Sequence, residues 1–339
     1  MATLADVARH AGVAASTVSY VLSGKRPVSE ETKERVGRSI ELLGYQPHAG
    51  ARALASAKSN VLALVVPLGR DLYVPVMMDI AIAVTTMARR FGYDVLLLTN
   101  DEGPAGIQRV ATSARADAVI LTDVGMEDER IAMVRETGID AVLIGVPADS
   151  AGLDCVDLDF ARAGALCVEH LAGLGHREVA FIGEAQGIYQ RHIGFAERTL
   201  GGIRDAAAQA GMNLVHRPCD GSYEAAAGVL ARILEERPRT TGLIVQNEAV
   251  IPSLLSLLRT AGRIVPEDVS IVAVCPDQVA QQTSPQLSSV NLPAAELGTR
   301  AVELLMRRMA DGTDGEVVLI PPTLTVRGST GPGAAASRG

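Results

Sequence analysis

Apolar and polar positions divide the chain into a short helical N-terminal part and a long part in which strands and helices alternate. Residues 4–11, 15–22 and 30–43 carry apolar side chains three or four positions apart, a spacing typical of amphipathic helices. Gly12 separates the first two segments, and glycine adopts the positive φ of a sharp turn without steric cost. The pattern predicts a helix-turn-helix, although an ordinary helical hairpin would look the same.

Capping signals mark the ends of these helices. Thr3 and Asp6 have the spacing of a capping box, and Ser29 precedes two glutamates where a helix dipole favours negative charge. Gly44 is expected to end the third helix. We expect Leu22 to join the core that the three helices enclose.

Residues 45–59 form an Ala-rich stretch with Leu54 as its one large apolar side chain. This stretch is either a solvated linker or a segment that becomes helical when it meets DNA. From Asn60 onward, near-continuous apolar runs indicate parallel strands that are covered on both faces. These runs are residues 61–67, 94–99, 118–122, 140–145, 178–183, 213–216, 241–246 and 269–274.

Helices are predicted between these strands, with the longest at residues 75–91, 162–174 and 195–210. Strands that alternate with helices indicate parallel α/β layers with right-handed crossovers. The strands form two series, which predict two similar lobes. Ligands bind beyond the carboxyl ends of parallel strands, so we expect a site in the cleft between the lobes.

Charge is distributed unevenly along the chain of 339 residues, whose net charge is −8. Residues 1–60 hold eight basic and five acidic side chains, a net charge of +3, whereas the remainder holds 23 basic and 34 acidic ones, a net charge of −11. A basic N-terminal part indicates a local surface for a polyanion. Aromatic residues make up only 3%, so the cores must consist mainly of Ala, Val, Leu and Ile.

Several functional classes lack their signatures. No apolar run is long enough to cross a bilayer, and the first residues, MATLADV, do not resemble a secretory signal. The four cysteines show no metal or disulfide spacing, which fits a reducing cytoplasm. Without GxGxxG after the first strand, a P-loop, GxSxG or HExxH, we expect neither an enzyme nor a cofactor or metal. A free periplasmic sugar-binding protein would account for the lobes but not for residues 1–58.

The run LADVARHAGVAASTVSYVLSGKRPVSEETKERV at 4–36 closely resembles the headpiece of lactose- and galactose-repressor (LacI/GalR) regulators. The similarity extends from about Thr3 to Val326. Further matching runs are ARALA (51–55), VDLDF (156–160), HLAGLGHREVAFIG (170–183), RHIGF (191–195) and PEDVSIVAV (266–274).

This resemblance implies an all-α helix-turn-helix headpiece followed by a two-lobed α/β core like that of periplasmic binding proteins, with parallel, Rossmann-like sheets. The expected division is a headpiece at 1–44, a hinge at 45–59, an N-lobe at 60–160 and 291–326, a C-lobe at 161–290 and a disordered tail at 327–339. The tail after Gly328 has neither a hydrophobic period nor the leucine heptads of tetrameric relatives, so we expect a homodimer.

The family's DNA contacts can be carried over position by position. Ala15, Ser16 and Tyr20 fall on base-reading positions of the recognition helix, and Thr17 and Ser19 fall on phosphate-contacting positions. The set also includes Thr3, Ser29, His48, Ala51 and Leu54.

Three of these positions call for comment. Ala14 stands where a capping Ser is usual, and Ala15 can only contact a thymine methyl group or avoid a clash. Tyr20 either reads a base or packs on the backbone. Leu54 matches the hinge leucine that wedges into the central base step.

In the effector pocket, Arg191 matches the first residue of the family's RxxGF pattern, and Asn247 matches the Asn of its QNE pattern. Phe160 stands where the family usually has Asn, and Glu248 where it usually has Asp. Arg191 is either a ligand residue or a surface arginine.

The family's aspartate after the 269–274 strand is replaced by Cys275, with Asp277 two residues on. Either Asp277 takes over its role or the effector is not a simple hexose. Tyr223 is either a pocket aromatic or a solvent-facing side chain.

The resemblance thus implies a cytoplasmic, sequence-specific regulator that binds double-stranded operator DNA and a small molecule, without a membrane partner. We expect a repressor of sugar uptake or catabolism genes that a sugar or oligosaccharide releases from a palindromic operator. A purine-type regulator that requires a corepressor is the alternative within the family.

Overall fold

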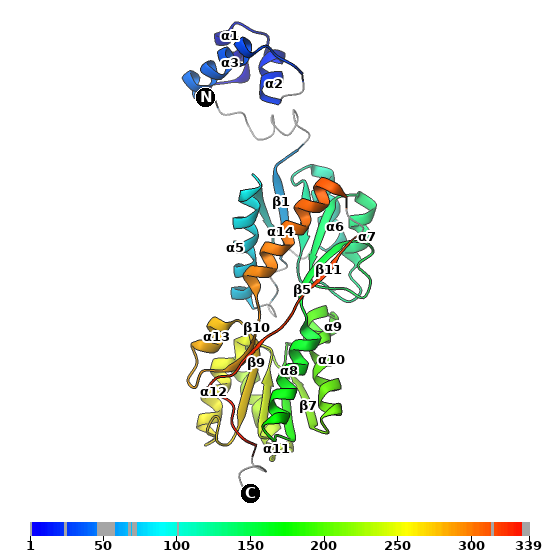
Figure 1. Cartoon of the computed structure of the whole chain (residues 1–339), viewed down its shortest axis with the longest axis vertical. Coiled ribbons are helices and arrows are strands. Elements are labelled where there is room, and N and C mark those ends of the chain that lie inside the picture. The colour runs from blue at the N-terminus through cyan, green and yellow to red at the C-terminus, as the bar shows by residue number, and fades with distance from the viewer. Residues whose placement is uncertain are drawn as a thin grey trace.

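The computed structural model describes residues 2–23, 26–45, 58–66, 69, 73–99, 102–312 and 315–333. Three helices stand at one end of the molecule, followed along its long axis by two lobes that each contain a sheet (Figure 1). The predicted fold class, a helical headpiece and a two-lobed α/β core, is confirmed.

The headpiece consists of α1 (Leu4–Ala11), α2 (Ala15–Ser23) and α3 (Glu30–Leu43). Its capping box is complete: the Thr3 hydroxyl accepts from the Asp6 amide at 3.3 Å, and the Asp6 carboxylate accepts from the Thr3 amide at 2.9 Å. Gly12 has φ +63° at the turn. The prediction for Leu22 is wrong, since this side chain is 36% exposed. The core is filled instead by Val7, Ala8, Ala11, Val18, Val36 and Tyr45.

The N-lobe sheet has the order β11-β5-β4-β3-β1-β2, with every pair parallel. Its strands are β1 (Val61–Val65), β2 (Asp94–Leu98), β3 (Ala118–Leu121), β4 (Asp140–Ile144), β5 (Asp154–Leu158) and β11 (Val317–Ile320). Its helices are α5 (Val74–Arg90), α6 (Gly103–Ser113), α7 (Glu129–Thr137) and α14 (Ala294–Asp311).

The C-lobe sheet has the order β12-β10-β9-β8-β6-β7 and is parallel apart from the β10–β12 pair. Its strands are β6 (Glu178–Gly183), β7 (Asn213–Pro218), β8 (Gly242–Val245), β9 (Ser270–Cys275), β10 (Ser288–Asn291) and β12 (Leu324–Thr325). Its helices are α8 (Phe160–Gly173), α9 (Gln186–Gln190), α10 (Gly194–Gln209), α11 (Tyr223–Glu236), the short η1 (Glu248–Val250), α12 (Ile251–Thr260) and α13 (Asp277–Gln281).

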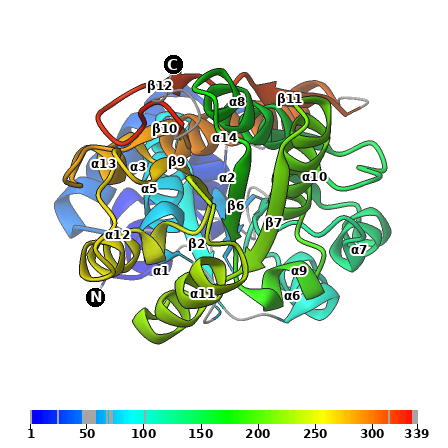
Figure 2. The same ribbon diagram turned by 90° about the horizontal axis from the view of Figure 1, so that it is seen from below.

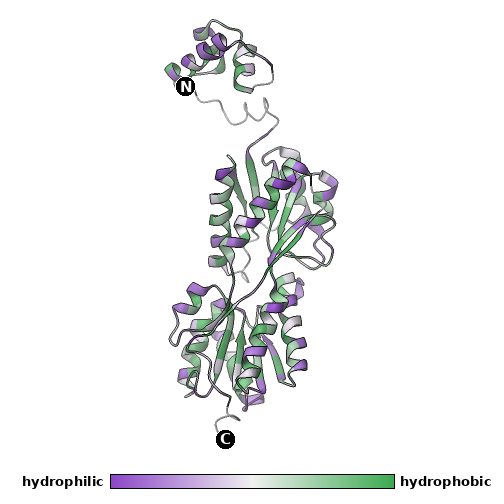
Figure 3. Cartoon of the chain, viewed as in Figure 1, coloured by the Kyte–Doolittle hydropathy of each residue, from purple (hydrophilic) through white to green (hydrophobic). Residues whose placement is uncertain are grey.

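Each sheet is covered on both faces, because successive strand side chains point to opposite sides. In the N-lobe, α5 and α14 pack on one face while α6 and α7 pack on the other. In the C-lobe, α8 and α10 lie on one side of the sheet and α11 and α12 on the other (Figure 2). Apolar residues accordingly concentrate in the strands, and polar ones on the outward helix faces (Figure 3).

The chain passes between the lobes three times: from β5 to α8, from β10 to α14 and from β11 to β12 (Figure 1). The four strands β5, β10, β11 and β12 at these crossings were not predicted as strands. Residues 324–325, expected in the N-lobe, pair with β10 in the C-lobe sheet instead.

The disordered tail predicted for 327–339 is wrong for residues 327–333. Ser329 is fully buried, and its hydroxyl donates to the Ile271 carbonyl at 2.6 Å and accepts from the Ser288 amide at 2.8 Å. Polar side chains can thus anchor a segment that lacks a hydrophobic pattern. Within the described parts of the chain, no helix is long and apolar enough to cross a membrane.

Candidate functional site

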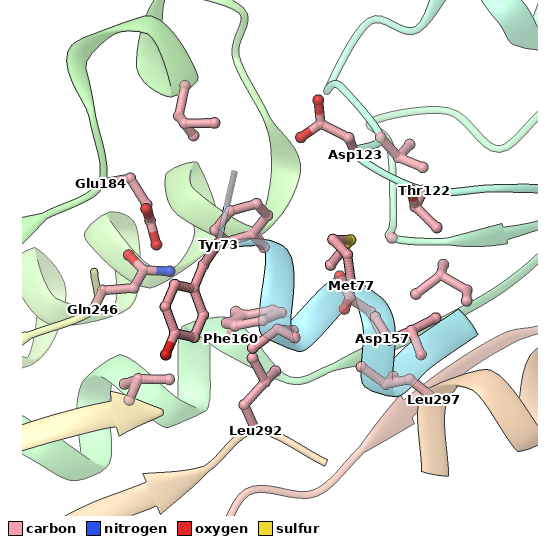
Figure 4. A pocket seen from close by; sticks show the side chains of 18 of the residues that line it. Tyr73, Met77, Thr122, Asp123, Asp157, Phe160, Glu184, Gln246, Leu292 and Leu297 are labelled. Carbon is pink, nitrogen blue, oxygen red and sulfur yellow. The ribbon is translucent and has the colours of Figure 1, made fainter. Parts of the chain in front are cut away.

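A cavity lies between the two lobes, at the carboxyl ends of strands from both sheets. It encloses about 850 Å³ of empty space, part of it open solvent. Helix α5 and the ends of β3, β4 and β5 contribute from the N-lobe, and the ends of β6, β8 and β9 from the C-lobe (Figure 4). This is the position that the parallel topology predicts for a ligand site.

Three almost fully buried carboxyl groups line this cavity: Asp157, Glu184 and Glu248. Burial raises the pKa of Asp157 to about 7, against the opposing charge of Arg198. Burial, aided by the charge of Asp123, raises the pKa of Glu184 to about 8. The pKa of Glu248 is raised well above its usual range, by burial and then by the charge of Glu184. The cavity therefore has an acidic lining that holds protons near neutral pH.

Two potential hydrogen-bond donors in the lining are already engaged within the protein. The Thr122 hydroxyl donates to the Val65 carbonyl at 2.9 Å, and the Gln246 amide nitrogen donates to the Thr199 hydroxyl at 3.0 Å. By contrast, the Gln246 Oε1 and Asp157 Oδ2 atoms are buried without a hydrogen-bond partner among the described residues. A ligand in the cavity can satisfy these acceptors.

Aromatic side chains contribute to the apolar part of the lining, alongside aliphatic ones. Phe160 and Phe195 pack against each other at 5.6 Å between ring centroids, and Tyr73 comes from the N-lobe. Such surfaces suit the apolar face of a ring-shaped ligand.

The lobes also touch each other beside the cavity. The Arg191 guanidinium in the C-lobe pairs with the Asp123 carboxylate in the N-lobe at 3.4 Å. The Gly194 amide donates to the Val124 carbonyl at 2.9 Å, and the Met126 amide donates to the His192 carbonyl at 2.8 Å. These contacts link the relative position of the lobes to the residues around the cavity.

The predicted effector residues are distributed unequally around this site. Phe160 lines the cavity directly, and Arg191 lies at its edge through the ion pair with Asp123. Asn247 does not line it: its amide nitrogen donates to the Cys219 carbonyl at 2.7 Å, and its oxygen caps η1.

The other three predicted residues also lie away from the cavity lining. Cys275 is fully buried at the end of β9. Asp277 lies in a separate surface depression next to α5 and pairs with Arg327 at 2.7 Å. Tyr223 begins α11 and is 54% exposed.

Sequence reasoning missed the polar residues that line the cavity, namely Asp123, Asp157, Glu184 and Gln246. Each lies at or just after the carboxyl end of a buried strand. The rule that ligands bind beyond such ends, applied to every apolar run, would have found three of them. Asp157 would have required β5 to be recognised as a strand.

In the headpiece, α2 presents Ala15 and Ser16 to solvent, with Thr17, Ser19 and Tyr20 partly exposed. The guanidinium of Arg26 lies over the Tyr20 ring, 5.2 Å from its centroid, and adds positive charge beside this helix. This surface is small enough to enter a major groove.

Other predicted DNA contacts lie at helix starts or outside the described residues. Ser29 caps α3 through the Thr32 amide at 3.4 Å, and Thr3 belongs to the capping box of α1. His48, Ala51 and Leu54 lie outside the described residues.

No group of three or more His, Cys, Asp or Glu side chains could hold a metal ion in the portion of the chain that the structure covers.

Comparison with known families assigns both parts of the chain. Residues 3–48 match the model of bacterial regulatory proteins of the lacI family, and residues 168–330 match that of the periplasmic binding protein-like domain.

The chain is 30% identical to the HTH-type transcriptional regulator CelR of Thermobifida fusca, over 96% of this chain and 98% of the relative. It is 28% identical to the HTH-type transcriptional repressor PurR of Vibrio atlanticus, over 92% and 93% respectively. A solved transcriptional regulator CelR–cellobiose complex superposes with a TM-score of 0.70 and 28% identity, over 97% of this chain and 100% of that one. These relatives are regulators of transcription, not enzymes.

Proposed function

Since the chain belongs to the LacI family of bacterial regulatory proteins, we propose that it represses sugar uptake or catabolism genes and leaves its operator when a sugar binds between the lobes. This proposal rests on the observation that one chain combines a helix-turn-helix with a cavity between two lobes. The solved CelR–cellobiose complex supports a sugar, in particular a disaccharide, as the effector class. Because such a regulator acts on the chromosome, we propose a cytoplasmic location.

We propose that Ala15, Ser16 and Tyr20 face base edges while Thr17 and Ser19 contact phosphates. The exposure of Ala15 and Ser16 supports this, because both side chains are accessible without rearrangement of the headpiece. Two headpieces of a homodimer would meet a palindromic site through a two-fold axis.

Repression and release are best tested with the whole chain. Selection from a random duplex pool should yield a palindrome that binds about 10³-fold more tightly than random DNA at one fixed salt concentration. Cellobiose or another β-linked disaccharide should then weaken operator binding, whereas hypoxanthine should not. Strengthening of operator binding by a purine would favour the corepressor alternative, and equal affinity for selected and random DNA would contradict a sequence-specific regulator.

The hinge can be tested separately through Leu54, the proposed minor-groove wedge. Leu54→Ala should weaken operator binding far more than random-DNA binding, since a wedge acts only where DNA is kinked and charge attraction acts on any duplex. Equal losses of affinity for operator and random DNA would show that Leu54 does not act as a wedge.

A further inference from the structure

Two hydrogen-bond acceptors in the cavity are open to a ligand. The Thr122 hydroxyl and the Gln246 amide nitrogen are engaged with Val65 and Thr199. Asp157 and Gln246 both line the cavity (Figure 4), and Asp157 Oδ2 and Gln246 Oε1 are buried without partners in the described residues. A ligand that fits this lining must itself bring hydrogen-bond donors, because buried acceptors without partners are costly.

The charged residues around the cavity also favour a ligand that brings hydrogen-bond donors. Four carboxyl groups line it, from Asp123, Asp157, Glu184 and Glu248, and the described lining residues include no Lys, Arg or His. Two described arginines that act on the lining carboxyls are also engaged with the protein: Arg191 pairs with Asp123, and Arg198, whose charge acts on Asp157, donates to the carbonyl of Val146 at 3.1 Å. An anionic ligand would find no cation among these lining residues, whereas a cationic ligand would lower the raised pKa values of the cluster, so that its carboxyl groups release protons and pair with it.

We propose that the effector site prefers a protonated amine on a sugar-like ring, so that an amino sugar binds more tightly than a neutral or phosphorylated sugar. The inference rests on the proposed function, in which this cavity binds the effector. An ammonium group has three donors and no acceptor, and it complements unpartnered acceptors better than a hydroxyl does. Because burial raises the pKa of Glu184 to about 8, the empty cluster holds protons that an ammonium group replaces.

The remaining lining suits the rest of such a molecule. Phe160 and Phe195, with ring centroids 5.6 Å apart, give an apolar surface for a ring face. No described set of side chains has the arrangement of a metal site, so a small organic cation fits the acidic lining better than a metal ion does.

Two disaccharides that differ only at carbon 2 provide a matched test. Cellobiose carries hydroxyls there, and the β-1,4-linked dimer of glucosamine carries amines. By calorimetry with the full-length protein at pH 7, we expect the amine-bearing dimer to bind about tenfold more tightly, because charge-assisted hydrogen bonds are roughly twice as strong as neutral ones. Its N-acetylated form, which lacks the charge, should lose this advantage.

Nearly isosteric variants test whether the carboxyl cluster causes the preference for the amine-bearing disaccharide. Asp157→Asn and Glu184→Gln should each bring the affinities of the two disaccharides closer together, while Glu235→Gln on the exposed surface of α11 should leave the tenfold ratio unchanged. Circular dichroism and operator binding, measured on the same samples, report whether each variant is folded.

Equal or tighter binding of cellobiose overturns the inference and leaves the proposed sugar-responsive function standing. Binding of neither disaccharide, or an unchanged ratio in both carboxyl variants, overturns it as well. If the wild-type protein bound selected and random DNA with equal affinity, that result would instead count against the proposed function.

Discussion

Arg191 joins the two lobes at the edge of the cavity, where its guanidinium meets Asp123 at 3.4 Å. The side chain is 43% exposed, so the ion pair contributes little to stability. We expect this residue instead to link ligand occupancy to the relative position of the lobes.

We therefore expect Arg191→Ala to retain operator affinity within about twofold but to weaken the release caused by effector at least about tenfold. The measurement is an operator-binding titration with and without effector. Arg232→Ala, on the exposed surface of α11, is the control and should behave like the wild type. Normal release by Arg191→Ala would exclude a sensing role for this residue.

The buried carboxyls make stability depend on pH. The pKa of Glu184 rises from 4.5 to about 8, so the folded chain holds a proton that the unfolded chain releases. The associated stabilisation is complete below about pH 4.5 and is lost as pH rises through 8. Asp157, with its pKa raised to about 7, acts in the same direction.

Glu184→Gln removes this titration and should raise the Tm at pH 8 by about 2–4 °C, for a gain on the order of 1 kcal/mol. At pH 5 the gain should be smaller. Thermal unfolding followed by circular dichroism at both pH values measures the difference, with Glu235→Gln as the exposed control. A gain that is equal at both pH values would mean that titration is not its cause.

At the scale of elements, α8 and α10 cross at glycines that allow their backbones to approach. A Cβ at Gly202 would lie 2.0 Å from the Ala161 carbonyl oxygen, whereas a Cβ at Gly201, one residue before, would meet nothing within 4 Å. Gly164 makes the reciprocal approach from α8, where a Cβ would lie 2.6 Å from the Thr199 carbonyl oxygen.

Adjacent substitutions should therefore have opposite effects. Gly202→Ala should lower the free energy of unfolding by about 2–3 kcal/mol because the crossing is overpacked. Gly201→Ala should raise it by about 0.5–1 kcal/mol, since alanine restricts the unfolded chain and favours a helix. Urea unfolding of both variants measures the pair, and a loss of equal size at Gly201 would show that the crossing is not the cause.

The sequence was sufficient for elements whose own pattern determines them, such as α1 with its capping box and the apolar strand β1. It was insufficient for β10, whose residues SSVN resemble a loop. Its buried serines are satisfied by partners far along the chain: the Ser288 hydroxyl accepts from the Arg327 amide at 2.9 Å, and the Arg327 guanidinium donates to the Ser289 hydroxyl at 2.7 Å. Such pairing depends on the assembled sheet and leaves no local signal.

The same limit applied to the cavity. Phe160 and Arg191 were found through family motifs, but Asn247 is occupied by structural hydrogen bonds. The acceptors left open, on Asp157 and Gln246, depend on which donors the fold has already engaged. Only the three-dimensional structure determines that.

At the scale of the molecule, residues of both lobes form one shared surface. A depression beside α5 is lined by Ile82 of that helix and by Asp277 of the C-lobe, and Ile82 is 64% exposed. An exposed apolar side chain on a surface shared by the lobes suits a subunit contact that senses their relative position.

We expect sedimentation velocity to give a dimer at micromolar concentration and Ile82→Asp to weaken it by at least about tenfold, because a charge would be buried at the interface. Ile264→Asp, at a side chain 60% exposed elsewhere on the C-lobe, should leave the dimer intact. A tetramer in the wild type, or a dimer that tolerates Ile82→Asp, would contradict this arrangement.

The three crossings between the lobes also determine the order in which parts of the chain can fold during synthesis. The headpiece is complete once residue 45 has emerged, whereas β11 of the N-lobe and β12 of the C-lobe are synthesised only after residue 316. Domains fold as they emerge, N-terminal parts first. The growing chain thus acquires its DNA-reading part long before either lobe has its final strand, and a transcript cut short before residue 317 would encode a headpiece without a finished sensor.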